Sequence, residues 1–348
     1  MSLIRYIKSN LLQVLDSAGV NSRVLSSSWR ARRLVIVCWH GISNDDEHRW
    51  DPGLFMPPET LRTRLELLRA MKCNVLPLSE GIARVRSGSL PPRAVCLTVD
   101  DGDSSFYLRA WPLLREYSFP ATLYWTTYYS TRPYAVFDPM LSYLLWKGQP
   151  GSLTLREPAL RCDLANPLER RQAFSTLYGF ARANDWSADR KEAFLVELAG
   201  LLGIDYAQIE SRRVLHLITP DEARAMVAEG LDLQLHTHRH RVPREPDRFA
   251  AELAENSSIL RAAGARTPAH FCYPSGSYVP EFARWLREGR VESATTCEFG
   301  LVDRDSDPYF LPRLMDHGAT SAAEFCGGLS GIAALLRRRR SVPQHGFA

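Results

Sequence analysis

The stretch Ala94-Val95-Cys96-Leu97-Thr98-Val99-Asp100-Asp101-Gly102 decides how the rest of the chain is interpreted. Its apolar, β-branched run predicts a buried strand, and that strand ends in two acids and a glycine. An unpaired buried charge is costly, so adjacent carboxylates at this position need a metal, a base partner or hydrogen-bond donors. We therefore hypothesise that Asp101 binds a metal ion and that Asp100 is a catalytic base.

Length and composition describe an ordinary globular protein. The 348 residues are enough for one large α/β domain or two smaller ones, and 24% of them are charged. The formal net charge of +4 is too small to indicate a nucleic-acid partner. The basic run 337–340 is expected to belong to a solvated, disordered tail over 331–348, with weak contact to anionic lipid or glycan as the alternative.

The cysteines and the N-terminal residues bear on the location of the protein in the cell. The seven cysteines are scattered and contain no C-x-x-C pair, which favours a reducing environment. Residues 1–21 carry charges and lack a continuous apolar core, so they predict neither a signal peptide nor a spanning helix. We expect a helical N-terminal segment over 1–33 that packs on the domain, with an interfacial anchor as the alternative. The expected location is the cytoplasm, and the alternative is a peripheral position on the inner face of the membrane.

Strands and helices alternate along most of the chain. The expected strands are 34–39, 74–78, 94–101, 121–126, 231–235, 269–273, 293–297 and 309–314. This order predicts parallel strands joined by crossover helices, and the lack of a glycine-rich phosphate loop favours a closed barrel over an open sheet. Residues 129–217 break the rhythm, so we predict a helical insertion there that serves as a lid, as a wall of the substrate site or as structural padding.

Groups capable of chemistry follow several of the expected strands. They are His40, Asp100 with Asp101, His236 with His240, and Tyr273. In an α/β barrel the carboxyl ends of the strands meet at the face where active sites are built. Taken singly, an acid pair or a histidine run can be a turn or a surface loop. Together, at the ends of neighbouring strands, they favour a metal site.

The proposed ligands are Asp101, His236 and His240. One carboxylate and two imidazoles leave open positions for water and substrate, as catalytic zinc sites require. A helical turn after the strand would put His236 and His240 on one side, whereas an extended chain would align His238 with them, so His238 is kept as a substitute ligand. A metal lowers the pKa of its bound water, and Asp100 could then take the proton during attack on a carbonyl.

Three motifs carry a resemblance to a known family. The stretches 97–102 (LTVDDG), 236–240 (HTxxH) and 271–276 (FCYPSG) resemble the polysaccharide deacetylase family, also called the NodB homology family or carbohydrate esterase family 4. Trp39-His40-Gly41 and the lead-in 90–95 are similar to its exopolysaccharide-associated members. The resemblance covers about 34–314 and leaves the insertion unmatched.

The resemblance implies a distorted (β/α) barrel of the NodB type over 34–330, with the helical insertion at about 129–217. It implies metal-dependent removal of an acetyl group from an N-acetylated sugar, oligosaccharide or glycolipid in cell-surface glycan biosynthesis. Asp100 would be the base, and the ligands Asp101, His236 and His240 would hold zinc or else nickel, cobalt or iron. Tyr273 would form one wall of the substrate groove and supply a backbone donor to the oxyanion.

The sequence departs from the family pattern at several positions. The arginine of the third motif is missing before Tyr273, and Arg313 on the last expected strand could take its charge-orienting role. The motif that supplies the general acid has no clean match; His317 is the nearest candidate, and a loop histidine is the alternative. Asp103 and His40 are expected to contact substrate at the barrel mouth, with a solvated turn acid as the alternative for Asp103.

Two other functions are compatible with these departures. One is a catalytically impaired glycan-binding protein, suggested by the missing arginine and the ambiguous acid. The other keeps the fold but changes the bond, giving a deformylase or amidohydrolase that acts on a lipid-linked or non-sugar substrate.

Overall fold

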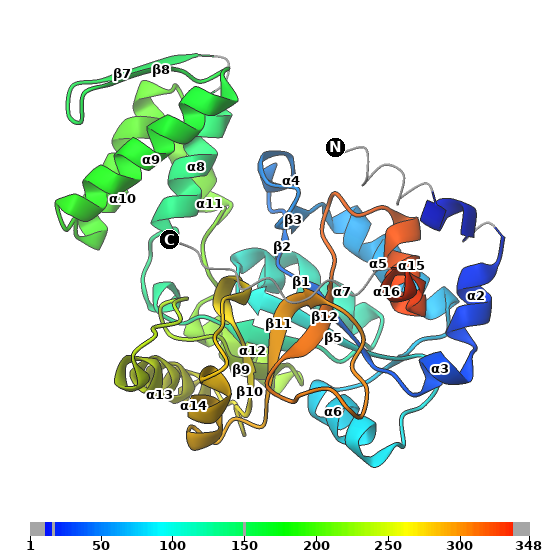
Figure 1. Ribbon diagram of the computed structural model, residues 1–348. Coiled ribbons are helices and arrows are strands. Elements are labelled where there is room, and N and C mark those ends of the chain that lie inside the picture. The colour runs from blue at the N-terminus through cyan, green and yellow to red at the C-terminus, as the bar shows by residue number, and fades with distance from the viewer. Residues whose placement is uncertain (1–10, 16–17, 149–150, 337–348) are drawn as a thin grey trace.

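The chain folds around a closed barrel of seven parallel strands in this computed structural model, which describes residues 11–15, 18–148 and 151–336 (Figure 1). The strands follow the ring order β1 (Val35–Trp39), β12 (Leu311–Met315), β11 (Ser293–Phe299), β10 (His270–Cys272), β9 (Asp232–Leu235), β6 (Thr122–Trp125) and β5 (Ala94–Asp101), and β5 pairs again with β1. The short strand β4 (Asn74–Val75) pairs with the start of β5 outside the ring. The predicted NodB-type barrel is thus confirmed. The first part of the expected N-terminal helical segment, residues 1–10, and the basic run 337–340 lie outside the described residues.

The alternation of side chains along strand β5 determines where Asp100 points. Val95, Leu97 and Val99 belong to the large core that the outer helices cover, whereas Ala94 and Cys96 belong to the small core inside the ring. Side chains alternate between the two faces of a strand, so Asp100 follows the inward set. The carboxylate therefore points into the barrel at the carboxyl end of β5.

Helices form the outer layer of the barrel and connect its strands. They are α5 (Pro58–Ala70), α6 (Leu78–Ser87), α7 (Trp111–Glu116), α12 (Pro220–Ala228), α13 (Pro246–Ala262), α14 (Phe282–Glu288) and α15 (Ala322–Ser330). Shorter elements are α2 (Val20–Leu25), α3 (Ser28–Ala31), α4 (Glu47–Trp50), α16 (Ile332–Leu335), β2 (Gly41–Ile42) and β3 (Phe55–Met56). Within the described ranges, no helix has the length and apolar character needed to cross a bilayer.

The helix expected after Gly102 is divided into two parts. A π-helical turn, η1 (Phe106–Ala110), precedes α7. Pro112 has no amide hydrogen, so a regular α-helical ladder cannot run through this point.

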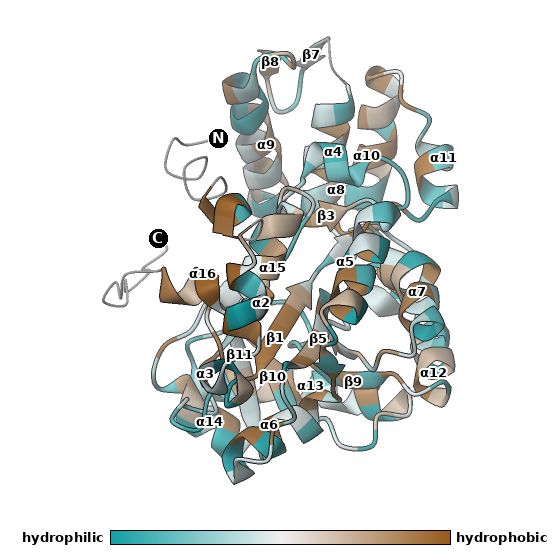
Figure 2. Ribbon diagram, turned by 90° about the vertical axis from the view of Figure 1, so that its right-hand side faces the viewer, coloured by the Kyte–Doolittle hydropathy of each residue, from teal (hydrophilic) through white to brown (hydrophobic). Residues whose placement is uncertain are grey.

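The insertion builds a second layer over one end of the barrel. It contains α8 (Phe137–Lys147), the hairpin β7 (Ser152–Leu155) and β8 (Leu160–Asp163), then α9 (Pro167–Ala183), α10 (Ala188–Leu201) and α11 (Tyr206–Ser211). Its buried side chains, among them Met140, Leu144, Leu177 and Leu198, form an apolar core of their own. The arrowhead of β1 points toward these helices in Figure 2, so the insertion lies beyond the carboxyl ends of the strands.

We expect Gly102→Ala to lower the free energy of unfolding by roughly 2 kcal/mol or more. Gly102 has φ +86°, and an added Cβ would lie 2.4 Å from Cδ1 of the buried Trp125. Urea denaturation followed by circular dichroism measures the change. The control is Gly179→Ala in α9, where nothing lies within 4 Å of the added Cβ, so a helical alanine should stabilise slightly. Equal effects of the two substitutions would contradict this account.

Candidate active site

A buried ion pair crosses the inside of the barrel between β5 and β12. Arg313 donates to Asp100 at two points, with Nη1 to Oδ1 and Nη2 to Oδ2 both at 2.7 Å. The side chains are 0% and 2% exposed, respectively. Burial works to raise the pKa of Asp100, but the charge and hydrogen bonds of Arg313 outweigh it and hold the pKa below its usual value. Asp100 is therefore ionised at neutral pH and fixed in one orientation.

Two buried thiols complete the surroundings of Asp100. The Sγ atoms of Cys38 and Cys272 lie 3.4 and 3.3 Å from its Oδ2. Burial raises the pKa of both thiols well above the usual value, so they stay protonated and donate. The arginine expected before Tyr273 is missing from the sequence, and Arg313 binds the Asp100 carboxylate from β12.

A carboxylate and two imidazoles converge beside this pair. His236 Nε2 and His240 Nε2 lie 3.0 and 3.1 Å from Asp101 Oδ1. Left-handed backbone at Asp101 (φ 70°), Thr237 (φ 59°) and His240 (φ 54°) turns the ends of β5 and β9 toward each other. Such strain in non-glycine residues clusters at functional sites. The structure thus brings together the three predicted ligands.

His238 does not take part in this cluster. Its Nδ1 lies 2.8 Å from Thr127 Oγ1, and its Nε2 lies 3.4 Å from Glu255 Oε2. The turn at Thr237 therefore separates His238 from His236 and His240, and the extended alternative does not apply.

The donor set fits a divalent metal. His236 Nδ1 lies 2.9 Å from the carbonyl oxygen of Cys272, and because a carbonyl only accepts, Nδ1 carries the hydrogen. Nε2 lies 3.0 Å from Asp101 Oδ1, so this nitrogen is the ring atom that could bind a metal ion together with the carboxylate. Two imidazole nitrogens and one carboxylate oxygen suit zinc and related divalent ions.

Asn256 on α13 holds this cluster in place and was not predicted. Its Oδ1 accepts from the backbone N–H of His236 at 2.9 Å, and its Nδ2 donates to the Trp125 carbonyl at 2.9 Å and to Thr127 Oγ1 at 3.1 Å. Asn256 is fully buried in the structure, but in the sequence it stands among polar residues of the helix, so nothing there singled it out.

A cavity of about 640 Å³ opens over the two acids. His40, Asp100, Asp101 and His240 line its inner end, and His40 Nε2 lies 3.8 Å from Asp100 Oδ2. Asp103 lines the cavity as well; its Oδ1 accepts from the N–H of Ser105, and burial raises its pKa to about 7.

Two residues expected in the site lie elsewhere. His317 does not line the cavity; it follows Asp316, which binds Trp39 and Arg64. The expectation for Tyr273 is wrong: its ring is fully buried, its hydroxyl donates to the Tyr309 carbonyl at 3.0 Å, and its N–H donates to the Thr295 carbonyl. The short strand β10 turns this side chain toward the helices, and Ser275 of the same motif lines the cavity instead.

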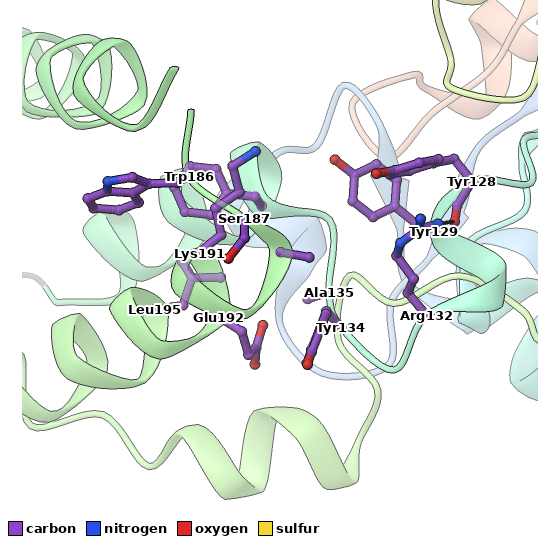
Figure 3. Close-up of a pocket in the computed structure, with 12 residues that line it drawn as sticks. Tyr128, Tyr129, Arg132, Tyr134, Ala135, Trp186, Ser187, Lys191, Glu192 and Leu195 are labelled. Carbon is purple, nitrogen blue, oxygen red and sulfur yellow. Dashed lines mark hydrogen bonds between the residues drawn. The ribbon is translucent and has the colours of Figure 1, made fainter. Parts of the chain in front are cut away.

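Aromatic rings from the insertion form the outer wall. Phe174 and Tyr178, four residues apart on α9, stack with centroids 5.6 Å apart and planes at 7°, and both line the cavity. A second cavity of about 170 Å³ adjoins it, and Figure 3 shows Tyr128 and Tyr129 on one side of it and residues of α10 on the other. The insertion is therefore a wall of the site.

We expect Arg313→Met to lower the free energy of unfolding at pH 7 by about 3–5 kcal/mol, because it leaves Asp100 buried without a partner. In the wild type the stability from the depressed pKa of Asp100 is present above its unfolded value and is lost as the pH falls toward the folded value. In the variant the pKa of Asp100 rises, so protonation at low pH relieves the buried charge. The stability gap, measured by urea denaturation, should narrow from pH 7 to pH 4; a constant gap would contradict the ion-pair account.

We expect the purified chain to hold one divalent metal and His236→Ala to lose it. Elemental analysis of the folded proteins measures the stoichiometry. The control is His238→Ala, which removes a histidine of the same loop that points away from the cluster and should keep the metal. Equal metal content in the two variants would reject the ligand assignment.

Comparisons with known proteins agree with this geometry. The family model "Polysaccharide deacetylase" matches residues 180–291, a range that contains His236 and His240 but not the acids of β5. The curated poly-β-1,6-N-acetyl-D-glucosamine N-deacetylase of Escherichia coli K12 is 30% identical over 101 residues, a match that spans 29% of this chain and only 15% of that protein.

Solved structures of deacetylases share the fold over most of the chain. Streptococcus pyogenes deacetylase PplD in complex with acetate has a TM-score of 0.57 at 16% identity, covering 85% of this chain and 98% of that one. IcaB from Ammonifex degensii has a TM-score of 0.52 at 17% identity, covering 87% and 96%. In the sequence of residues 180–291 and in its barrel fold, the chain is similar to polysaccharide deacetylases.

Proposed function

We propose that the chain hydrolyses the amide of an N-acetylated amino sugar in a metal-dependent reaction. One observation carries the proposal: the cluster Asp101, His236 and His240 and the arginine-held carboxylate of Asp100 adjoin in one cavity. The similarity to the Escherichia coli deacetylase of poly-β-1,6-N-acetyl-D-glucosamine supports an amino-sugar substrate. The products are acetate and the free amine.

Each protein group has a separate task in this reaction. A divalent metal, most simply zinc, bound by Asp101, His236 and His240 would supply Lewis acidity toward the acyl oxygen and acidify a water. Asp100 takes the proton of the attacking water, and Arg313 holds the Asp100 carboxylate toward the cavity. Arg313 is a positioning residue, because it is fully buried behind Asp100.

His40 is the proposed donor of the proton to the leaving amine. Water adds to the acyl carbon, the carbon–nitrogen bond breaks, and the nitrogen must gain a proton. Among the described histidines, His40 and His240 line the cavity, and His240 belongs to the ligand cluster. We therefore assign to His40 the role that the sequence suggested for His317.

The aromatic lining supports a sugar as substrate. Tyr129, Phe174 and Tyr178 line the cavity, and aromatic rings present flat apolar faces on which a pyranose can pack. The free cysteines support a reaction in the cytoplasm, on a precursor of a cell-surface glycan or glycolipid. The alternative of a catalytically impaired site loses support, because Arg313 binds the Asp100 carboxylate from β12 although the third-motif arginine is missing.

We expect Asp100→Asn and His40→Ala each to reduce kcat for acetate release from N-acetylglucosamine oligomers by about 10²–10⁴-fold. Both variants should keep the metal, because neither residue belongs to the cluster. The matched control is His317→Ala, which should retain activity. Acetate release that survives Asp100→Asn, or that is lost only in His317→Ala, would overturn these assignments.

A further inference from the structure

The wall that the insertion contributes to the cavity is cationic as well as aromatic. Arg182 ends the stripe of Phe174 and Tyr178 on α9, and Lys191 lies on the first turns of α10. Arg241, next to the cluster histidine His240, faces the same cavity from the barrel side. These three side chains, Arg182, Lys191 and Arg241, are called the cationic rim below.

Among the described residues, the side chains of the cationic rim form no ion pair. Arg239, the fourth basic residue of the lining, pairs with Glu252 and Glu255 at 2.9 and 2.8 Å. Within the described part of the chain, none of the three rim residues has a carboxylate within 4.0 Å. Arg182 and Lys191 instead lie over the rings of Tyr178 and Phe137, at 5.9 and 5.6 Å from the centroids.

The acids on the same side only partly offset the rim. Asp138 on α8 lines the cavity. Burial raises its pKa, although the positive charges of His240, Arg241 and Lys191 act to lower it. Glu192 faces the smaller cavity, and burial raises its pKa as well. The acids at the inner end are already engaged, Asp100 by Arg313 and Asp101 by the two histidines.

Lys191 lies where the two cavities adjoin. Together with Tyr129 and Phe137 it lines both the large cavity and the smaller one between α10 and the segment after β6 (Figure 3). A ligand with its N-acetyl group at the inner end would therefore extend past Tyr178 toward Lys191. The position that meets the cationic rim is the part of the ligand beyond the reacting sugar.

We infer that the substrate is an N-acetylated sugar joined to an anionic group, a phosphate or a carboxylate, which the cationic rim binds. This inference rests on the proposed function and specifies its substrate class. Lys191 is half-buried, and Arg182 and Arg241 are exposed toward the cavity. Cations in this position can form charge-assisted hydrogen bonds with an anion, which a neutral glycan cannot offer.

Calorimetric titration of the protein without added metal tests the inference independently of turnover. UDP-N-acetylglucosamine represents the phosphate arm, a hyaluronan tetrasaccharide the carboxylate arm, and chitotetraose the neutral comparison. We expect at least one anionic ligand to bind about tenfold more tightly than chitotetraose, with a preference that weakens at high salt. The arm that shows the preference identifies the source of the anion.

Lys191→Gln and Arg182→Gln should each remove most of this preference while leaving chitotetraose binding within twofold. The matched control is Arg190→Gln, which removes one positive charge next to Lys191 in the sequence. The Arg190 side chain stacks over Trp186 and lines neither cavity. Equal binding of anionic and neutral ligands, or a preference that survives in Lys191→Gln, would overturn the inference. A preference without acetate release would overturn the proposed function alone, and acetate release without a preference would overturn the inference alone.

Discussion

The buried pair of Asp100 and Arg313 is the interaction on which the rest of the site depends. Two charges without access to water are tolerated only because each satisfies the other at two points, and because Cys38 and Cys272 donate to the remaining face of the carboxylate. The pair requires β5 and β12 to flank β1 in a closed ring, since Arg313 reaches Asp100 across the barrel interior. Closure of the barrel therefore also fixes the orientation of Asp100.

The neighbouring carboxylate has the opposite environment. Asp101 leaves the strand in a left-handed conformation and meets two imidazoles at the edge of the cavity, where a ligand can reach it. Asp100 is extended and pairs with the buried Arg313 inside the barrel, whereas the left-handed backbone of Asp101 brings its carboxylate to His236 and His240.

Much of this arrangement could be predicted from the sequence, and the failures have physical reasons. Strand and helix alternation predicted the ring, and the polar residues at strand ends predicted the Asp101 cluster. Tyr273 was misplaced because β10 has only three residues, and its orientation depends on pairing with β9 and β11. The cavity wall could not be predicted, since Phe174, Tyr178 and Lys191 resemble ordinary surface or core positions of helices until α9 and α10 are placed over the barrel.

The central claim is that this cavity is the active site of a metal-dependent amide hydrolase. The most direct test is to titrate metal-stripped protein with zinc and to follow acetate release from an N-acetylated sugar oligomer. The account predicts no release from the stripped protein and a rise that ends at one equivalent, since one cluster of Asp101, His236 and His240 faces the cavity. Full activity of the stripped protein, or a rise that continues well past one equivalent, would contradict it.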